Sequence, residues 1–194
     1  MEKGGTWIAA NRKGSAGVLL NGAGKKHIPV SSYRYSRGLV LPQILVAEDP
    51  VEAFQKLDSI GLEPFTLVLY VGKRLYEGKW DGAVKSLDCL PEDQPRIWSS
   101  ITLYSDEVHE KRKNWFYQWL KANPIPDAES IFKLHRYGGE GEPEIDFVMK
   151  PANEMGTVSI TSIELGSNST LMNYHPIVED KVYRSRLYLS DKTK

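Results

Sequence analysis

Histidines, which serve both as metal ligands and as acid–base groups, are few and scattered along the chain. The histidines are His27, His109, His135 and His175. None of them has a second histidine or an acidic partner at the spacing of a zinc site, such as an HExxH helix. The sequence therefore predicts no metal site, and no motif indicates a cofactor.

Cysteine content and hydropathy indicate the cellular compartment in which the protein is expected. Cys89 is the single cysteine of 194 residues, so neither an internal disulfide nor a CxxC zinc or redox motif is available. A buried or half-buried thiol is the default expectation for it. No apolar segment approaches the length of a membrane span, and no apolar stretch follows a basic start as in a signal peptide. We therefore expect a cytoplasmic protein without a membrane span.

Charge is balanced, with 25 basic and 25 acidic residues. A nucleic-acid-binding function is not expected, because counterion release requires a basic face on the protein. The basic run Lys111-Arg112-Lys113 lies on a predicted helix rich in tryptophan, where we expect a solvated basic face beside a buried aromatic stripe. A hydrophobic share of 41% suits a globular domain that buries a core without disulfides or metal.

The first half of the chain predicts a hairpin followed by helices. Residues 6–20 read as a β-hairpin whose turn contains asparagine and glycine. Residues 36–47 are mostly apolar and predict a helix, kinked or restarted at Pro42. A clearer helix begins with Asp49 as N-cap and a proline directly after it, and Gly61 is expected to end it.

Strands dominate the rest of the chain, separated by two helices. The apolar run 65–71 predicts a buried central strand that pairs with 74–80. Further strands are predicted at 84–87, 97–103, 157–165, 170–175 and 182–189, and helices at 105–122 and 127–137. This order fits an α+β fold, an αββα sandwich in which helices flank antiparallel sheets. We expect residues 1–194 to form a single domain.

Three short motifs occur in order along the chain. They are Gly4-Gly5-Thr6-Trp7-Ile8-Ala9 with Leu19-Leu20-Asn21-Gly22, then Tyr35-Ser36-Arg37-Gly38-Leu39-Val40, then Met155-Gly156-Thr157-Val158-Ser159 with Tyr183-Arg184-Ser185-Arg186. Together they resemble the NRDE family, also called the transport and Golgi organisation family. The resemblance implies an αββα sandwich like that of N-terminal-nucleophile hydrolases.

The catalytic segment of the family is missing from this sequence. Members typically begin Met-Cys and then carry Asn-Arg-Asp-Glu; the segment 11–14 shares two letters with that motif but lies at the hairpin turn. An N-terminal nucleophile needs a thiol or hydroxyl on residue one, with its α-amine, of pKa about 8, as the base. Met1 and Glu2 provide neither, so we expect an N-terminally incomplete domain that is inactive as given. A cut before Thr6 would expose a hydroxyl, but the preceding glycines are more simply turn residues.

The resemblance leaves two candidate site residues. Asn21 matches the family asparagine after the hairpin strand, where its amide could donate to an oxyanion; a turn residue before Gly22 is at least as good an interpretation. Ser100 stands where members often have asparagine, which weakens a hydrolytic interpretation. Val158 stands where many members have arginine, so a clamp for an acidic group is lost.

Two hypotheses from different classes follow. In the first, the complete form of an NRDE-type protein is an N-terminal-nucleophile-like amidase or acyltransferase. It cleaves or transfers an amide-linked acyl group. In the second, the chain is a non-catalytic binding or trafficking module for a lipid or another small apolar ligand, which the changes at Ser100 and Val158 favour. A third is a degraded paralogue, whose unpaired strand edges would cause self-association.

Overall fold

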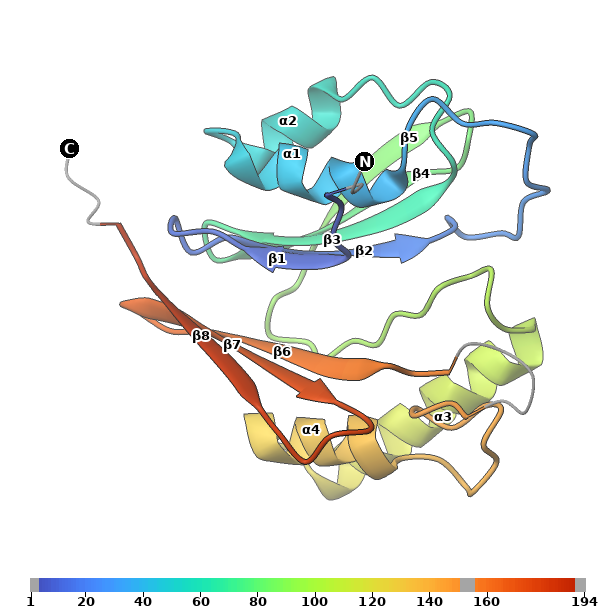
Figure 1. The fold of residues 1–194 in the computed structure, drawn as a ribbon, viewed down its shortest axis with the longest axis vertical. Helices are drawn as coiled ribbons and strands as arrows, with labels where there is room; N and C mark the ends of the chain where they lie inside the picture. The colour runs from blue at the N-terminus through green and yellow to red at the C-terminus, as the bar shows by residue number, and fades with distance from the viewer. Residues whose placement is uncertain (1–3, 151–155, 191–194) are drawn as a thin grey trace. The chain divides into compact units, whose positions relative to one another are not determined.

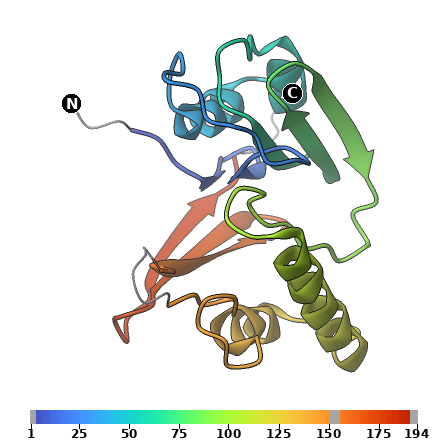
Figure 2. The ribbon, with the colours of Figure 1, turned by 90° about the vertical axis from the view of Figure 1, so that its right-hand side faces the viewer.

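The computed structural model describes residues 4–150 and 156–190, and these divide into two compact units (Figure 1). Unit 1 comprises the described residues up to Leu103 together with residues 188–190, and unit 2 comprises the described residues of Tyr104–Leu187. Each unit has its own sheet and its own helices (Figure 2), so the predicted α+β class with antiparallel sheets is confirmed. That residues 1–194 form one domain stays a prediction.

Unit 1 contains a five-stranded antiparallel sheet in which neighbours in sequence are neighbours in space. Its strands are β1 (Ile8–Ala10), β2 (Ala16–Asn21), β3 (Phe65–Val71), β4 (Arg74–Trp80) and β5 (Lys85–Leu90). The predicted N-terminal hairpin is confirmed, with Ile8 opposite Val18. Gly72 and Lys73 join β3 to β4 with φ angles of 59° and 63°, the left-handed pair that a tight two-residue hairpin turn requires.

The first helical segment of unit 1 differs in one respect from expectation. A 3₁₀ turn at Arg37–Leu39 leads directly into α1 (Val40–Val46). Pro42 neither kinks nor restarts this helix, because it lies in the first turn of α1, where a backbone N–H has no partner within the helix. The change from 3₁₀ to α geometry occurs before Val40 instead.

The second helix, α2 (Pro50–Lys56), begins where the sequence predicts. The Asp49 carboxylate accepts from the main-chain nitrogens of Val51 at 2.8 Å and Glu52 at 3.0 Å. The helix ends at Lys56 and not at Gly61, because the chain turns away to bury Leu57 in the core. Gly61, with a φ of 76°, belongs to the following turn.

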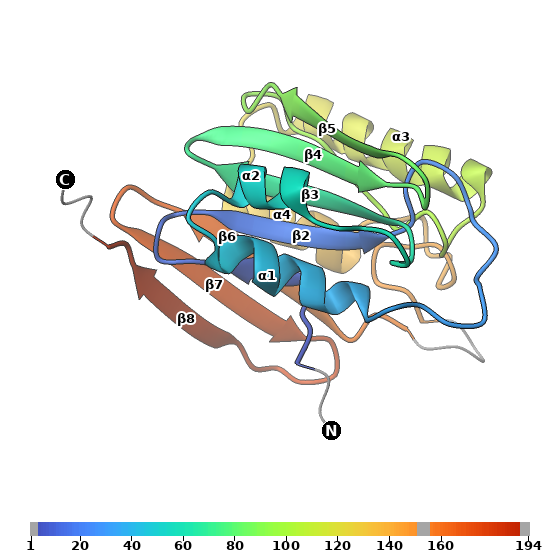
Figure 3. The same ribbon diagram turned by 90° about the horizontal axis from the view of Figure 1, so that it is seen from above.

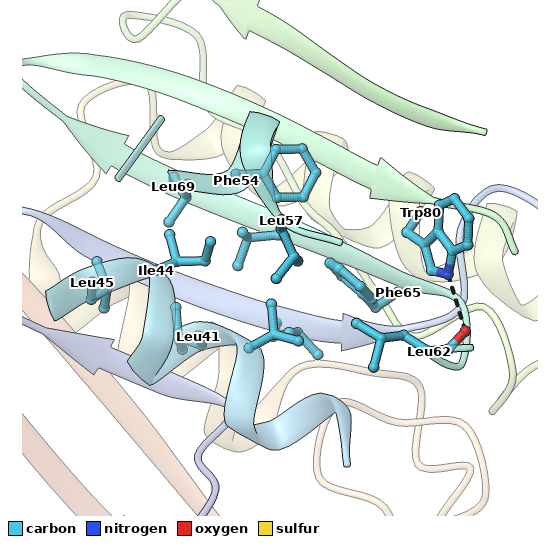
Figure 4. Packing of buried hydrophobic residues seen from close by; sticks show 12 residues of the cluster. Leu41, Ile44, Leu45, Phe54, Leu57, Leu62, Phe65, Leu69 and Trp80 are labelled. Atoms are coloured by element: carbon cyan, nitrogen blue, oxygen red, sulfur yellow. Dashed lines mark hydrogen bonds between the residues drawn. The ribbon is translucent and has the colours of Figure 1, made fainter. Parts of the chain in front are cut away.

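Helices α1 and α2 cover one face of the unit 1 sheet (Figure 3), and the core lies between the two layers (Figure 4). The buried cluster consists of Leu19, Val40, Leu41, Ile44, Leu45, Phe54, Leu57, Leu62, Phe65, Leu67, Leu69 and Trp80. Gly78 lets a helix side chain approach the sheet, since a Cβ there would lie 2.6 Å from the Phe54 ring. The Trp80 indole donates to the Leu62 carbonyl at 3.0 Å (Figure 4), which satisfies its buried N–H.

Unit 2 has two helices and a three-stranded sheet in the order β6–β7–β8. Its elements are α3 (Asp106–Ala122), α4 (Ala128–Tyr137), β6 (Ser159–Leu165), β7 (Ser169–Pro176) and β8 (Tyr183–Tyr188), whose last residue falls in unit 1. Both helices begin at their predicted caps: Ser105 accepts from the Val108 nitrogen, and Asp127 forms a reciprocal capping box with Ser130. No helix among the described residues is long and apolar enough to cross a membrane.

The predicted strand at 97–103 is wrong. These residues are irregular, and the Ile101 nitrogen donates to the Asn21 carbonyl at 2.9 Å at the end of β2. The contact with β2 is confined to the end of that strand, because β1 pairs with Ala16, Gly17 and Val18 farther along the same strand.

Two expectations about single side chains are also wrong. Cys89 is exposed on β5, an edge strand of the sheet. Arg112 is buried, although the surrounding basic run indicated a solvated face. Its guanidinium donates to the carbonyls of Ile145 and Asp146, both at 3.1 Å, and lies 4.5 Å from the Tyr104 ring centroid.

Candidate functional site

Two of the sequence motifs lie against each other in unit 1. The Thr6 nitrogen donates to the Gly38 carbonyl at 2.9 Å. A Cβ on Gly5 would lie 2.9 Å from the Gly38 carbonyl carbon, so the backbones meet where no side chain fits. The Thr6 hydroxyl donates to the Ile8 carbonyl at 2.9 Å. Close packing therefore accounts for the glycine before Thr6.

The two candidate site residues come together at the end of β2. Asn21 is the last residue of that strand, opposite Phe65 of β3. Its main-chain nitrogen donates to the Ser100 hydroxyl at 3.3 Å, and its carbonyl accepts from Ile101. These bonds hold the segment 100–101 against β2 where β1 no longer covers it. Ser100 thus acts on the backbone of Asn21, and a catalytic role for either residue stays a prediction.

The Asn21 side chain retains hydrogen-bonding capacity. Its Oδ1 is buried and has no hydrogen-bond partner in the described part of the chain. Strand alternation places the side chain on the face of β2 that also carries Leu19, toward the helices. Buried polar atoms are almost always paired, so this amide oxygen is an exception among the described residues.

The backbone beside Asn21 is fixed by its neighbours. The Gly22 nitrogen donates to the Pro64 carbonyl at 3.0 Å, and the Thr66 hydroxyl donates to the Gly22 carbonyl at 2.9 Å. Gly22 has a φ of 81°, and a Cβ there would lie 3.0 Å from the Ile101 Cβ. The glycine is therefore needed both for the left-handed turn and for the close approach of residue 101.

A charged group that the sequence did not reveal adjoins this end of the sheet. His27 Nε2 lies 3.1 Å from one carboxylate oxygen of Glu63, and the other is 2.9 Å from Arg37 Nη2. Arg37 also donates through Nη1 to the Pro64 carbonyl at 2.8 Å, the same carbonyl that Gly22 uses. Burial lowers the pKa of Arg37 from its ordinary value, while the charge of Glu63 opposes that effect.

Histidine spacing gave no signal for this group, since His27 was only one of four scattered histidines. Glu63 and His27 are 36 positions apart, so only the fold brings them together. Arg37 had one signal, its place in the Tyr35–Val40 motif. Within residues 4–150 and 156–190, no three histidine, cysteine, aspartate or glutamate side chains converge as a metal site.

The remaining residues of the sequence argument lie elsewhere. Val158 belongs to unit 2, just before β6, and its side chain is exposed; its carbonyl accepts from the Ile177 nitrogen at 2.9 Å. The loss of a clamp at this position stays a prediction. Met1, Glu2 and Met155 lie outside the described residues.

Comparison with known proteins agrees with the first two motifs, and the third lies beyond the matched residues. The model of the family described as Transport and Golgi organisation 2, for which NRDE is another name, matches residues 1–129. No curated protein matches the chain. The matched residues include the two packed glycine motifs, Asn21 with its partner Ser100, and the His27–Glu63–Arg37 group. A match over more than half of the 194 residues shows that the chain belongs to the Transport and Golgi organisation 2 family.

Proposed function

We propose that this chain is an N-terminal-nucleophile-like domain that binds an amide-linked acyl group at the end of β2. The observation that carries the proposal is the buried, unpaired Oδ1 of Asn21. The hydrogen bonds around Asn21 and Gly22 hold the backbone there in one position. A ligand that displaces the side chains covering Oδ1 would meet an asparagine on a fixed backbone, which lowers the entropy cost of binding.

An amide is the ligand group that Asn21 complements best. A carboxamide offers one acceptor oxygen and two N–H donors. The ligand N–H would donate to Asn21 Oδ1, and because a secondary amide is trans, its carbonyl would point away from the Asn21 side chain. An ester of the same shape lacks the N–H and would leave the buried oxygen unpaired, at a cost of about 1–3 kcal/mol. The acyl chain supplies the apolar part of the ligand.

Binding without turnover is the form that the described residues support. The Ser100 hydroxyl accepts a main-chain N–H, and the Thr6 hydroxyl donates to a main-chain carbonyl. Neither makes a hydrogen bond to a histidine within the described residues, so neither has the adjacent base that activates a hydroxyl.

The second candidate function is hydrolysis or transfer of the same acyl group. It requires a thiol or hydroxyl nucleophile at a chain terminus, as the family resemblance implies. Asn21 Nδ2 would then donate to the developing oxyanion, an interaction that typically contributes a factor of about 10²–10³ in rate.

Paired probes test the amide site. The isotope-labelled chain is titrated with N-hexylacetamide and with hexyl acetate, which differ only at the N–H, and NMR follows the signals of Asn21, Gly22 and Ile101. We expect the amide to shift all three signals and the ester to bind at least about tenfold more weakly. Product analysis of the same samples should show no hydrolysis.

Two asparagine variants complete the test. Asn21→Leu should abolish the preference for the amide. Asn173→Leu is the matched control, because Asn173 in β7 also has a buried Oδ1 without a partner among the described residues. Equal binding of amide and ester, or an unchanged preference in Asn21→Leu, would contradict the proposal; hydrolysis would favour the second candidate.

A further inference from the structure

Unit 1 carries an exposed group of aliphatic and basic side chains on two loops. Ile28 is 91% exposed and Val30 58% exposed on the loop after β2, and Ile60 is 75% exposed on the loop after α2. Lys25 and Lys26 precede Ile28 and are exposed as well. We call these five residues the basic–apolar tip.

Hydrogen bonds join the two loops. Next to Ile28, His27 Nε2 lies 3.1 Å from Glu63 Oε1. Farther along the same loop, the Arg34 nitrogen donates to the Gly61 carbonyl at 2.8 Å. The loop turns where the Val30 nitrogen donates to the Tyr33 hydroxyl at 3.1 Å. The exposed aliphatic side chains are therefore presented on a fixed support, which lowers the entropy cost of docking.

The charge at the tip is positive. The neighbouring acidic side chains are neutralised within the fold: Asp58 pairs with Arg34, and Glu63 pairs with both His27 and Arg37. Lys25 and Lys26 form no ion pair with any residue that the structure describes. Two cations are thus free to meet an anionic surface.

We propose that the basic–apolar tip docks unit 1 on the surface of a membrane that contains anionic lipid. Ile28, Val30 and Ile60 would enter the boundary between headgroups and acyl chains, while the two lysines contact lipid phosphates. The chemistry fits a lipid surface better than a protein groove, since protein interfaces are enriched in aromatic side chains and depleted in lysine. The docking does not depend on the amide site of Asn21.

Vesicle flotation tests the proposal with the full chain. Vesicles of phosphatidylcholine with 30% phosphatidylserine, as an order-of-magnitude composition for an anionic leaflet, are compared with vesicles of phosphatidylcholine alone. We expect binding to the anionic vesicles that weakens as salt rises. Lys25→Gln and Lys26→Gln should each reduce the partition coefficient about fivefold. Ile28→Asp should abolish binding while leaving the circular dichroism spectrum unchanged.

A matched control separates this tip from exposed apolar residues in general. Val46 at the end of α1 is 82% exposed in the same unit, and the nearby Glu48 is paired with Lys13 at 2.8 Å. Val46→Asp should bind vesicles like the unchanged chain. Absence of binding to anionic vesicles would overturn the proposal, and so would equal binding to neutral ones or equal losses in Ile28→Asp and Val46→Asp.

Discussion

Each of the two units is stabilised by a different kind of core. Unit 1 buries a continuous aliphatic and aromatic cluster between α1, α2 and its sheet. The side chains buried in the described part of unit 2 are Arg112, Phe116, Leu134, Phe147, Thr170 and Pro176. Arg112 lies 4.9 Å from the Phe147 ring centroid, and burial lowers its pKa from the ordinary value. Unit 2 thus contains a desolvated cation where unit 1 contains leucines.

This difference explains why the sequence was easier to interpret in unit 1 than in unit 2. Apolar runs and alternation report a hydrophobic core directly, and unit 1 is built on such a core. A buried arginine among lysines has the same sequence pattern as a solvated face, so the centre of unit 2 gave no signal. The family match has a similar boundary: residues 1–129 include the described part of unit 1 up to Leu103 but only α3 and the start of α4 from unit 2.

The largest expected effect concerns the core of unit 1. Phe54→Ala removes a ring that is fully buried between Gly78 and Phe65, so it should lower the free energy of unfolding by about 3–5 kcal/mol. Urea unfolding measures the loss, and hydrogen exchange should locate it in β2, β3 and β4. Val46→Ala, an exposed change on α1, should cost about 0.5 kcal/mol or less. Equal costs would show that this cluster is not the core of unit 1.

A smaller effect is expected at the centre of unit 2. Arg112→Ala leaves the carbonyls of Ile145 and Asp146 without their donor and removes the contact with two aromatic rings, for a loss of about 2–3 kcal/mol. Hydrogen exchange should rise in α3. Lys113→Ala, one position along, should change stability by no more than about 0.5 kcal/mol. A neutral Arg112→Ala variant would remove the contrast between the two cores.

The Asn21 end of unit 1 can be probed with two glycines. Gly22 and Gly72 both have positive φ angles, of 81° and 59°, but only Gly22 has a near neighbour, the Ile101 Cβ. Alanine at either position pays about 1 kcal/mol for the left-handed conformation, and Gly22→Ala should cost about 1 kcal/mol more because residue 101 must move. Thermal unfolding measures the difference. Identical costs would mean that segment 100–101 is not held against β2.

The smallest effect is a pH dependence at the cap of α4. The main-chain and side-chain hydrogen bonds from Ser130 lower the folded-state pKa of Asp127. Because the folded-state pKa is lowered, ionised Asp127 stabilises the folded protein at pH values above its unfolded pKa of about 3.9. This stabilisation is lost as the pH falls through the folded-state pKa. Asp127→Asn keeps the cap but cannot titrate. The free energy of unfolding, measured from neutral to acidic pH, should therefore fall less steeply with decreasing pH for the variant. An equal pH dependence in the two proteins would contradict this assignment.

Local patterns predicted the elements wherever one segment contained the whole signal. β3 spans Phe65–Val71, as its apolar run between Pro64 and Gly72 predicted, and α4 spans Ala128–Tyr137 between its predicted cap and Gly138. The segment 97–103 failed because strand formation also needs a free partner, which no local pattern reports. Pro42 failed as a kink because its effect depends on which turn of the helix it occupies.

The sequence alone determined the secondary structure of most segments, the α+β class and the family. Periodicity, caps and turn glycines act over a few residues, so they can be seen without the fold. Only the tertiary structure decided that Ser100 holds the backbone of Asn21, 79 positions away, and that Glu63 joins His27 to Arg37. These contacts form because strand register and loop packing bring distant residues within hydrogen-bonding distance. The local spacing of the residues does not predict these contacts.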